Sequence, residues 1–182
     1  SRLLRDVSAI VESRAAEAGV TMTEDDRSDP MTIAWVYGSP LHLRQIFLNI
    51  YSNCIKYNKK GGRITTCVRC LESDREHVTY RWEIADTGIG MSEEFLHRIF
   101  DPFAQATTDA RSMYQGTGLG MTIVKKLLDC MNGTIEVRSK EGEGSVFTIT
   151  IPFEIAEKKE SDSSAEASEE MSIRGARLLL AE

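Results

Sequence analysis

The chain has 182 residues, a formal net charge of −6 and 27% charged residues, values that are ordinary for a globular protein. This length suffices for one well-buried domain and a tail. The acidic balance offers no clustered Lys and Arg surface, so we expect no nucleic-acid partner. No apolar run approaches the roughly 20 residues that span a bilayer, and no signal peptide opens the chain.

The N-terminal region predicts a helix followed by two short strands. Ser1 already lies inside an amphipathic pattern, so we expect a fragment of a longer polypeptide. Short extended pieces are expected around residues 20–23 and 32–36. The first helix ends at Gly19 and is predicted from apolar residues at helical spacing: Leu3, Leu4, Val7, Ile10, Val11, Ala15 and Ala18.

A second helix is predicted from Ser39, as N-cap, and Pro40, at the first helical position, to about Asn58. The elements expected after it are, in chain order, a hairpin of strands over 64–71 and 77–85, a short helix over 92–100, a mobile loop over 104–115, a helix ending at Gly133, and strands over 134–139 and 145–153.

Together these elements predict an α+β fold of two layers, a helix/sheet sandwich with a mixed, mostly antiparallel sheet and helices on one face. We assign residues 1–153 to this domain. Residues 154–173 are rich in Ser, Glu, Lys and Ala, which predicts a disordered acidic linker. Residues 174–182 begin a further apolar segment.

Three polar residues of the second helix, Asn49, Asn53 and Lys56, are spaced i, i+4 and i+7. At about 100° per residue they fall within a wedge of about 60° beside the apolar stripe. Asparagine oxygens can hold Mg²⁺ or its waters, and lysine offers a cation to phosphate. A solvated helix boundary explains the same three residues equally well when they are taken alone.

Two glycine-rich segments extend this pattern. Asp86 ends a predicted strand and precedes Gly88 and Gly90, whose missing Cβ atoms allow a flat ligand to approach the backbone. A buried carboxylate accepts hydrogen bonds, so it suits the exocyclic amine of adenine. The second segment, residues 116–120, places three glycines at a helix N-terminus, where free N–H groups attract phosphate. This segment lacks the Gly-Lys-Ser/Thr ending that defines a P-loop.

Four segments in this order, NIYSNCIKYN, DTGIGM, IFDPFAQ and GTGLGM, resemble the N, G1, F and G2 boxes of the ATP-binding catalytic domain of bacterial sensor histidine kinases. That domain belongs to an ATPase superfamily with DNA gyrase, the heat-shock chaperone and the MutL mismatch-repair proteins. The resemblance covers residues 1–153 and implies the Bergerat-type ATP-binding fold, with ATP and Mg²⁺ as cofactors.

The resemblance also implies roles for individual residues. Asn53 would hold Mg²⁺, and Asn49 and Lys56 would face the phosphates, which makes these three the catalytic candidates. Tyr57 would border the nucleotide and Asp86 would bind adenine. Phe100 and Phe103 would anchor a lid over 104–115. The further nucleotide-binding candidates are Gly88, Gly90, Phe103, Gly116, Thr117, Gly118, Leu119 and Gly120.

By this resemblance the chain transfers the γ-phosphoryl group of MgATP to a histidine in two-component signalling. None of His42, His77 and His97 lies in the sequence context of an acceptor, so we expect the acceptor in a dimerisation domain of the same parent chain. The ARLLLAE segment resembles the first strand of a receiver domain. A receiver domain or response regulator is therefore the second expected partner, and the parent would be a hybrid kinase.

Three alternatives stay open: a hydrolysing ATPase, an anti-sigma-type serine kinase of the same superfamily, and a degenerate nucleotide sensor. In hydrolytic members a glutamate four residues before the Mg²⁺ asparagine activates water. Asn49 occupies that place here and disfavours hydrolysis. We expect a monomeric fragment in the cytoplasm, whether or not its parent is attached to the membrane.

Overall fold

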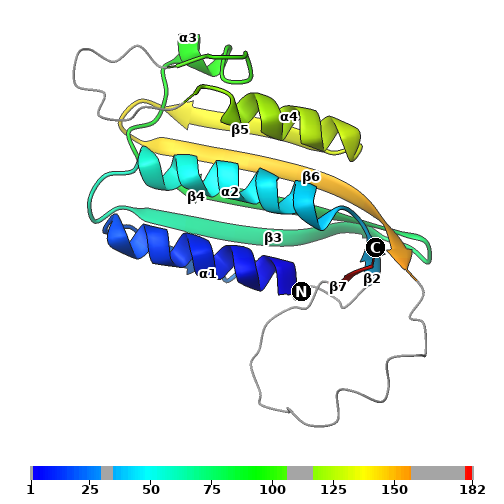
Figure 1. Cartoon of the computed structure of the whole chain (residues 1–182). Coiled ribbons are helices and arrows are strands. Elements are labelled where there is room, and N and C mark those ends of the chain that lie inside the picture. Colours follow the sequence, from blue (N-terminus) through cyan, green and yellow to red (C-terminus); the bar gives the residue numbers. More distant parts are fainter. Residues whose placement is uncertain (1, 30–34, 106–116, 157–178, 182) are drawn as a thin grey trace.

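The computed structural model of the chain describes residues 2–29, 35–105, 117–156 and 179–181. Three long helices lie side by side on one face of a sheet (Figure 1). They are α1 (Arg2–Glu17), α2 (Pro40–Lys56) and α4 (Gly120–Cys130), and a single short turn of helix, α3 (Glu93–Leu96), lies near β5. None of the helices in the described ranges is long and apolar enough to cross a membrane.

Within the described residues seven strands form one mixed sheet in the order β1-β3-β4-β6-β2-β7, and β5 pairs with β6. The β1–β3 and β2–β7 pairs are parallel and the others are antiparallel. The predicted two-layer α+β fold is confirmed. The strands are β1 (Thr21–Glu24), β2 (Trp35–Tyr37), β3 (Arg63–Ser73), β4 (His77–Asp86), β5 (Thr134–Lys140), β6 (Gly144–Ala156) and β7 (Leu179–Ala181).

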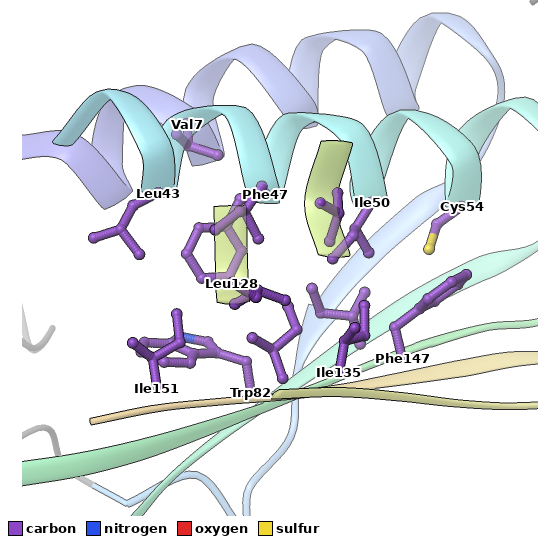
Figure 2. Packing of buried hydrophobic residues seen from close by; sticks show 14 of the residues in the cluster. Val7, Leu43, Phe47, Ile50, Cys54, Trp82, Leu128, Ile135, Phe147 and Ile151 are labelled. Atoms are coloured by element: carbon purple, nitrogen blue, oxygen red, sulfur yellow. The ribbon is translucent and has the colours of Figure 1, made fainter. Parts of the chain in front are cut away.

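The hydrophobic core lies between the two layers (Figure 2). Strands present every second side chain to one face, and β4 accordingly buries Val78, Tyr80, Trp82 and Ile84. Residues three and four apart share one face of a helix, so α2 buries Leu43, Ile46, Phe47, Ile50 and Cys54. The ring of Phe47 meets that of Trp82 edge-on, with the ring centroids 5.4 Å apart.

Local signals define the start of α2 as predicted. The Ser39 Oγ accepts a hydrogen bond from the His42 N–H at 3.3 Å, and Pro40 is the first helical residue. The helix ends at Lys56, two residues before the predicted end. The Tyr57 N–H still donates to the Asn53 carbonyl at 3.0 Å, so the last turn directs the chain into the loop before β3.

The elements that differ in length from their predictions include α3 and β6. α3 ends at Leu96 instead of residue 100, because the backbone then forms turns in which the Arg98 N–H bonds to the Phe95 carbonyl at 2.9 Å. β6 continues to Ala156, three residues beyond the predicted end, since its last two residues pair with β2.

Several predictions fall outside the described residues. These include most of the expected loop over 104–115, Gly116, and the linker beyond Ala156. β7 lies within residues 174–182 and pairs in parallel with β2, Trp35 opposite Leu179. Its assignment to a receiver domain stays a prediction.

Candidate nucleotide-binding site

The polar edge of α2 meets the start of α4. Asn49, Asn53 and Lys56 are all half-buried. A Cβ placed on Gly120, the first residue of α4, would lie 3.8 Å from both Cγ and Oδ1 of Asn49. The Asn49 Nδ2 is buried and has no hydrogen-bond partner within the described part of the chain. Such an unmade bond costs about 1–3 kcal/mol, so this amide is suited to a ligand that brings an acceptor.

The start of α4 is open to an anion. Its N-cap position is Leu119, which provides no side-chain hydrogen bond to the first turn. The first amide groups of a helix therefore keep their N–H donors available, and the helix dipole favours negative charge there. Thr117 is exposed and Gly118 is half-buried just before this helix, while Gly116 lies outside the described residues.

The Asp86 turn is fitted closely against the end of α2. The Gly88 N–H donates to the Asp86 Oδ1 at 2.8 Å, and the Ile89 N–H donates to the Tyr57 carbonyl at 3.0 Å. A Cβ at Gly88 would lie 2.3 Å from that carbonyl oxygen, a distance that no side chain tolerates. A glycine at this position therefore lets the turn after β4 pack directly against the end of α2.

The β5–β6 hairpin supports the turn from the other side. Gly90 has a φ of +67°, and a Cβ there would lie 1.9 Å from the Lys140 carbonyl oxygen. The Gly142 N–H donates to the Ile89 carbonyl at 2.7 Å, and the Met91 N–H donates to Ser139 Oγ at 2.9 Å. These bonds fix the Asp86 turn between α2 and the hairpin.

Burial raises the pKa of the Asp86 carboxyl. The Gly88 amide, which donates to Oδ1, opposes this shift most, and the nearby Cys54 and Ser145 oppose it less. The carboxylate is thus half-buried and held by the Gly88 amide. It can offer a remaining lone pair to the amine of a ligand.

Phe103 contacts Gly118. The described residues just before 106–116 therefore lie next to those just after it. The Phe103 N–H donates to the Gly118 carbonyl at 3.1 Å, and a Cβ on Gly118 would lie 2.8 Å from the Phe103 Cα. Phe103 has a φ of +62° and is 70% exposed. Nearby, the Thr122 hydroxyl donates to the Phe100 carbonyl at 3.0 Å, which attaches this segment to α4.

The C-terminal end of α2 carries an exposed ring and a cation. The Lys56 Nζ lies 4.8 Å from the centroid of the Tyr57 ring. This cation–π contact keeps the ammonium group at the helix end, next to the Asp86 turn that Tyr57 supports through its carbonyl.

Two contacts of Asp86 were missed by the sequence analysis. Cys54 was given no role, and residue 145 was predicted only as the start of a strand. Ser145 lies opposite Asp86 in the β4–β6 pairing. The sequence signal for Ser145 is weak, because the pairing joins residues that are far apart in the chain.

Comparisons with known proteins agree with this geometry. The chain matches the model of the family described as histidine kinase-, DNA gyrase B-, and HSP90-like ATPase over residues 38–155. The sensory/regulatory protein RpfC of Xanthomonas campestris pv. campestris is 37% identical over 120 residues, which cover 66% of this chain and 16% of RpfC. The sensor histidine kinase RcsC of Salmonella typhimurium is 41% identical over 116 residues, 64% of this chain and 12% of RcsC.

Solved structures show the same fold. Full-length ShkA in complex with AMPPNP has a TM-score of 0.65 at 30% identity and is matched over 85% of this chain and 30% of its own. The mycobacterial sensor histidine kinase MprB has a TM-score of 0.64 at 25% identity, with 85% and 96% covered. The chain spans less than a fifth of the length of RpfC and of RcsC. Since the family model covers more than half of the chain, this protein belongs to the histidine kinase-, DNA gyrase B- and HSP90-like ATPase family.

Proposed function

We propose that this chain is the catalytic domain of a hybrid histidine kinase, which binds MgATP and transfers its γ-phosphoryl group to a histidine on a dimerisation domain of the parent protein. The observation that carries the proposal is the buried, unpartnered Asn49 Nδ2 beside Gly120, where an uncapped helix start faces the polar edge of α2. A triphosphate offers oxygen acceptors to both groups.

The remaining site residues fit MgATP. Asp86 would accept a hydrogen bond from the exocyclic amine of adenine, and it would repel the oxo group that guanine carries at the same place. Asn53 would hold Mg²⁺ through its amide oxygen, and Lys56 would face the phosphates. When bound, the metal ion neutralises the charge that develops on the phosphate oxygens.

Transfer is favoured over hydrolysis by the side chain at position 49. An amide cannot take a proton from water at neutral pH, so Asn49 cannot serve as the general base of an ATPase. The domain would hold the γ-phosphoryl group in one position, and the nucleophile would come from the dimerisation domain.

The relatives support this assignment at the level of the whole protein. A protein named as a hybrid kinase, hybrid signal transduction histidine kinase B of Dictyostelium discoideum, is 38% identical over 124 residues. The ShkA structure contains AMPPNP, an ATP analogue. We therefore propose the acceptor domain and a receiver domain as partners, and the cytoplasm as the location.

Nucleotide binding tests the site. Calorimetric titrations with ADP, ATP and GTP, each with and without Mg²⁺, are expected to show binding of the adenine nucleotides and none of GTP. Asp86→Asn should abolish the binding of ADP, because an amide presents a donor where the amine of adenine needs an acceptor. Equal binding of GTP and ATP would contradict the role of Asp86.

Phosphoryl transfer tests the reaction and separates the alternatives. With γ-labelled ATP and a separately purified dimerisation domain of a related histidine kinase, we expect acid-labile label on the acceptor. Acid-stable label would identify the serine kinase, and rapid release of phosphate without acceptor would identify the ATPase. Binding of ATP without any transfer to this acceptor would identify the nucleotide sensor.

A further inference from the structure

Two arginines lie opposite each other on the outer face of the sheet, the face directed away from α1, α2 and α4. Successive strand residues point to opposite faces, and Tyr80 and Trp82 of β4 are buried in the core. Arg81, between them, therefore lies on the outer face, which none of the three long helices covers in the described part of the chain (Figure 1). The β3–β4 register places Arg69 directly opposite Arg81.

Neither arginine has an acceptor for its Nε atom. Both side chains are half-buried, and each Nε is buried without a hydrogen-bond partner among the described residues. Like charges directly opposite each other in a sheet repel, and a buried donor without an acceptor disfavours the free protein. An anion that binds between the two guanidinium groups removes both of these unfavourable effects.

Acidic residues close to the pair do not neutralise it. Glu83 lies two residues beyond Arg81 on the same face, yet it forms no ion pair with either arginine in the described ranges. Asp25 lies beside β3, where its N–H donates to the Thr66 carbonyl at 2.8 Å. Both of its carboxylate oxygens accept from Arg27, at 2.9 and 2.7 Å. Solvent or a binding partner is therefore left to supply the acceptor.

The residues around the pair indicate the kind of partner. Thr150 of β6 lies opposite Arg81, and Thr134 of β5 lies opposite Thr150. With neighbouring strands about 4.8 Å apart, this row of polar side chains extends about 14 Å across the sheet, further than a small anion reaches. Glu83 and Glu136 occupy the next row on the same face, and the chain has a net charge of −6, so a nucleic acid would be repelled.

We propose that the outer face of β3 and β4 is a docking surface for an acidic segment of a protein partner, whose carboxylates bind between Arg69 and Arg81. A carboxylate offers about four lone-pair positions, enough for the forked guanidinium groups of both arginines. The threonine hydroxyls beside the pair can bind polar groups of the same segment. This surface includes neither Asn49 nor Asp86, so it is a second site beyond the proposed function.

Binding of a labelled hexaglutamate peptide, followed by fluorescence anisotropy at low ionic strength, tests the surface, and hexaglutamine is the uncharged control peptide. Arg69→Gln and Arg81→Gln each remove one guanidinium group. Arg138→Gln is the matched control, because Arg138 is exposed on the same face, in β5 opposite Val146. Circular dichroism and thermal unfolding establish that each variant is folded. Arg81→Lys, which keeps the charge and loses the fork, replaces a glutamine variant that does not fold.

We expect the wild type to bind hexaglutamate and not hexaglutamine. Each glutamine variant should weaken this binding about five- to tenfold, as for loss of a hydrogen bond between charged groups, and Arg81→Lys about threefold. Arg138→Gln should change it by less than about twofold. The affinity for ADP should stay the same in every variant, because the surface contains no nucleotide-binding candidate.

Absence of hexaglutamate binding to the wild type, or equal weakening by Arg138→Gln, would overturn the docking surface, since the second result would show attraction to charge alone. Displacement of the peptide by an equal concentration of inorganic phosphate would identify a free-anion site instead. Tighter binding of single-stranded DNA than of the peptide would identify a nucleic-acid surface. The ADP titrations test the proposed function independently of all these results.

Discussion

At the scale of single residues, Asp86 combines two opposing demands. The proposed binding of adenine needs its ionised carboxylate, whereas burial in the folded protein disfavours that charged form. Its carboxyl is partly removed from water, and the effect of this burial on its pKa exceeds the opposing effect of the groups around it. A group of this kind lowers the stability of the free protein and gains its use when a ligand supplies a further donor.

Asp86→Asn is expected to raise or preserve stability while it abolishes ADP binding. For a carboxyl whose folded pKa lies above its unfolded value of 3.8, the free energy of unfolding falls as pH rises from 3.8 through the folded pKa and stays lower above it. The amide removes this penalty. Thermal unfolding without nucleotide should therefore give a Tm at or above wild type near pH 7.5, and a smaller difference near pH 4. A clearly lower Tm near neutral pH would contradict this account.

Phe103 stores backbone strain next to the proposed site. Its φ of +62° places a residue with a Cβ in the left-handed region, and its 70% exposed ring gains little from packing. Phe103→Gly should stabilise the nucleotide-free protein by about 0.5–1 kcal/mol, the relief of strain less the added freedom of the unfolded chain. Urea unfolding measures this change in the free energy of unfolding. Phe103→Ala is the control, since it keeps the Cβ and should give no gain.

At the scale of elements, α2 connects the core, the sheet and the site. Tyr51, on its flank, shares a hydrogen bond between its hydroxyl and that of Thr66 on β3, with the two oxygens 2.8 Å apart. Burial raises the pKa of Tyr51 to about 12. The phenol is therefore kept neutral and the helix is tied to the strand below it.

Tyr51→Phe tests this tie. We expect a loss of about 1 kcal/mol near pH 7, because the half-buried Thr66 hydroxyl loses its partner. In the wild type, a neutral phenol with a raised folded pKa contributes stability that is present below pH 10 and lost as pH rises toward 12. The variant should lose less stability than wild type over that alkaline range. Equal losses in urea unfolding across these pH values would show that Tyr51 is not the group responsible.

The elements that could be predicted from sequence are those with local signals. The start of α2 follows from Ser39 and Pro40, and its buried stripe from the spacing of its apolar residues. The last residues of β6 could not be predicted, because they are strand only through pairing with β2. The same holds at the site. Asp86 and Gly88 are two residues apart in sequence, whereas the approach of Cys54 and Ser145 depends on how α2 and β6 pack.

At the scale of the whole molecule, one cluster of aromatic rings joins the two layers. Phe47 of α2 packs edge-on against Trp82 of β4, and Trp82 contacts Phe153 of β6 with ring centroids 6.4 Å apart. Of the site residues, Lys56 is the last residue of α2 and Asp86 is the last residue of β4. Their positions therefore depend on the packing of the rings.

Phe47→Ala is expected to destabilise the fold by about 3–5 kcal/mol, since it leaves a cavity at the contact between the layers. Both layers should unfold together, so near-ultraviolet and far-ultraviolet circular dichroism should give one transition at a lower Tm. Leu41→Ala is the control on the same helix, because Leu41 is 71% exposed and its removal should change stability by less than about 0.5 kcal/mol. A small effect of Phe47→Ala would mean that the layers are held together elsewhere.

The pairing of β2 with the end of β6 also bears on how the protein is made. β2 leaves the ribosome early, yet its antiparallel partners are Ile155 and Ala156, which are synthesised after all of the other described elements except β7. At about 5–20 residues per second, Val36, which is fully buried in the finished fold, waits several seconds without its neighbours. During that interval the nascent chain presents an apolar strand to chaperones and proteases. A ribosome-bound chain that stops before residue 150 should therefore be cleaved near β2 by a protease that spares the completed domain.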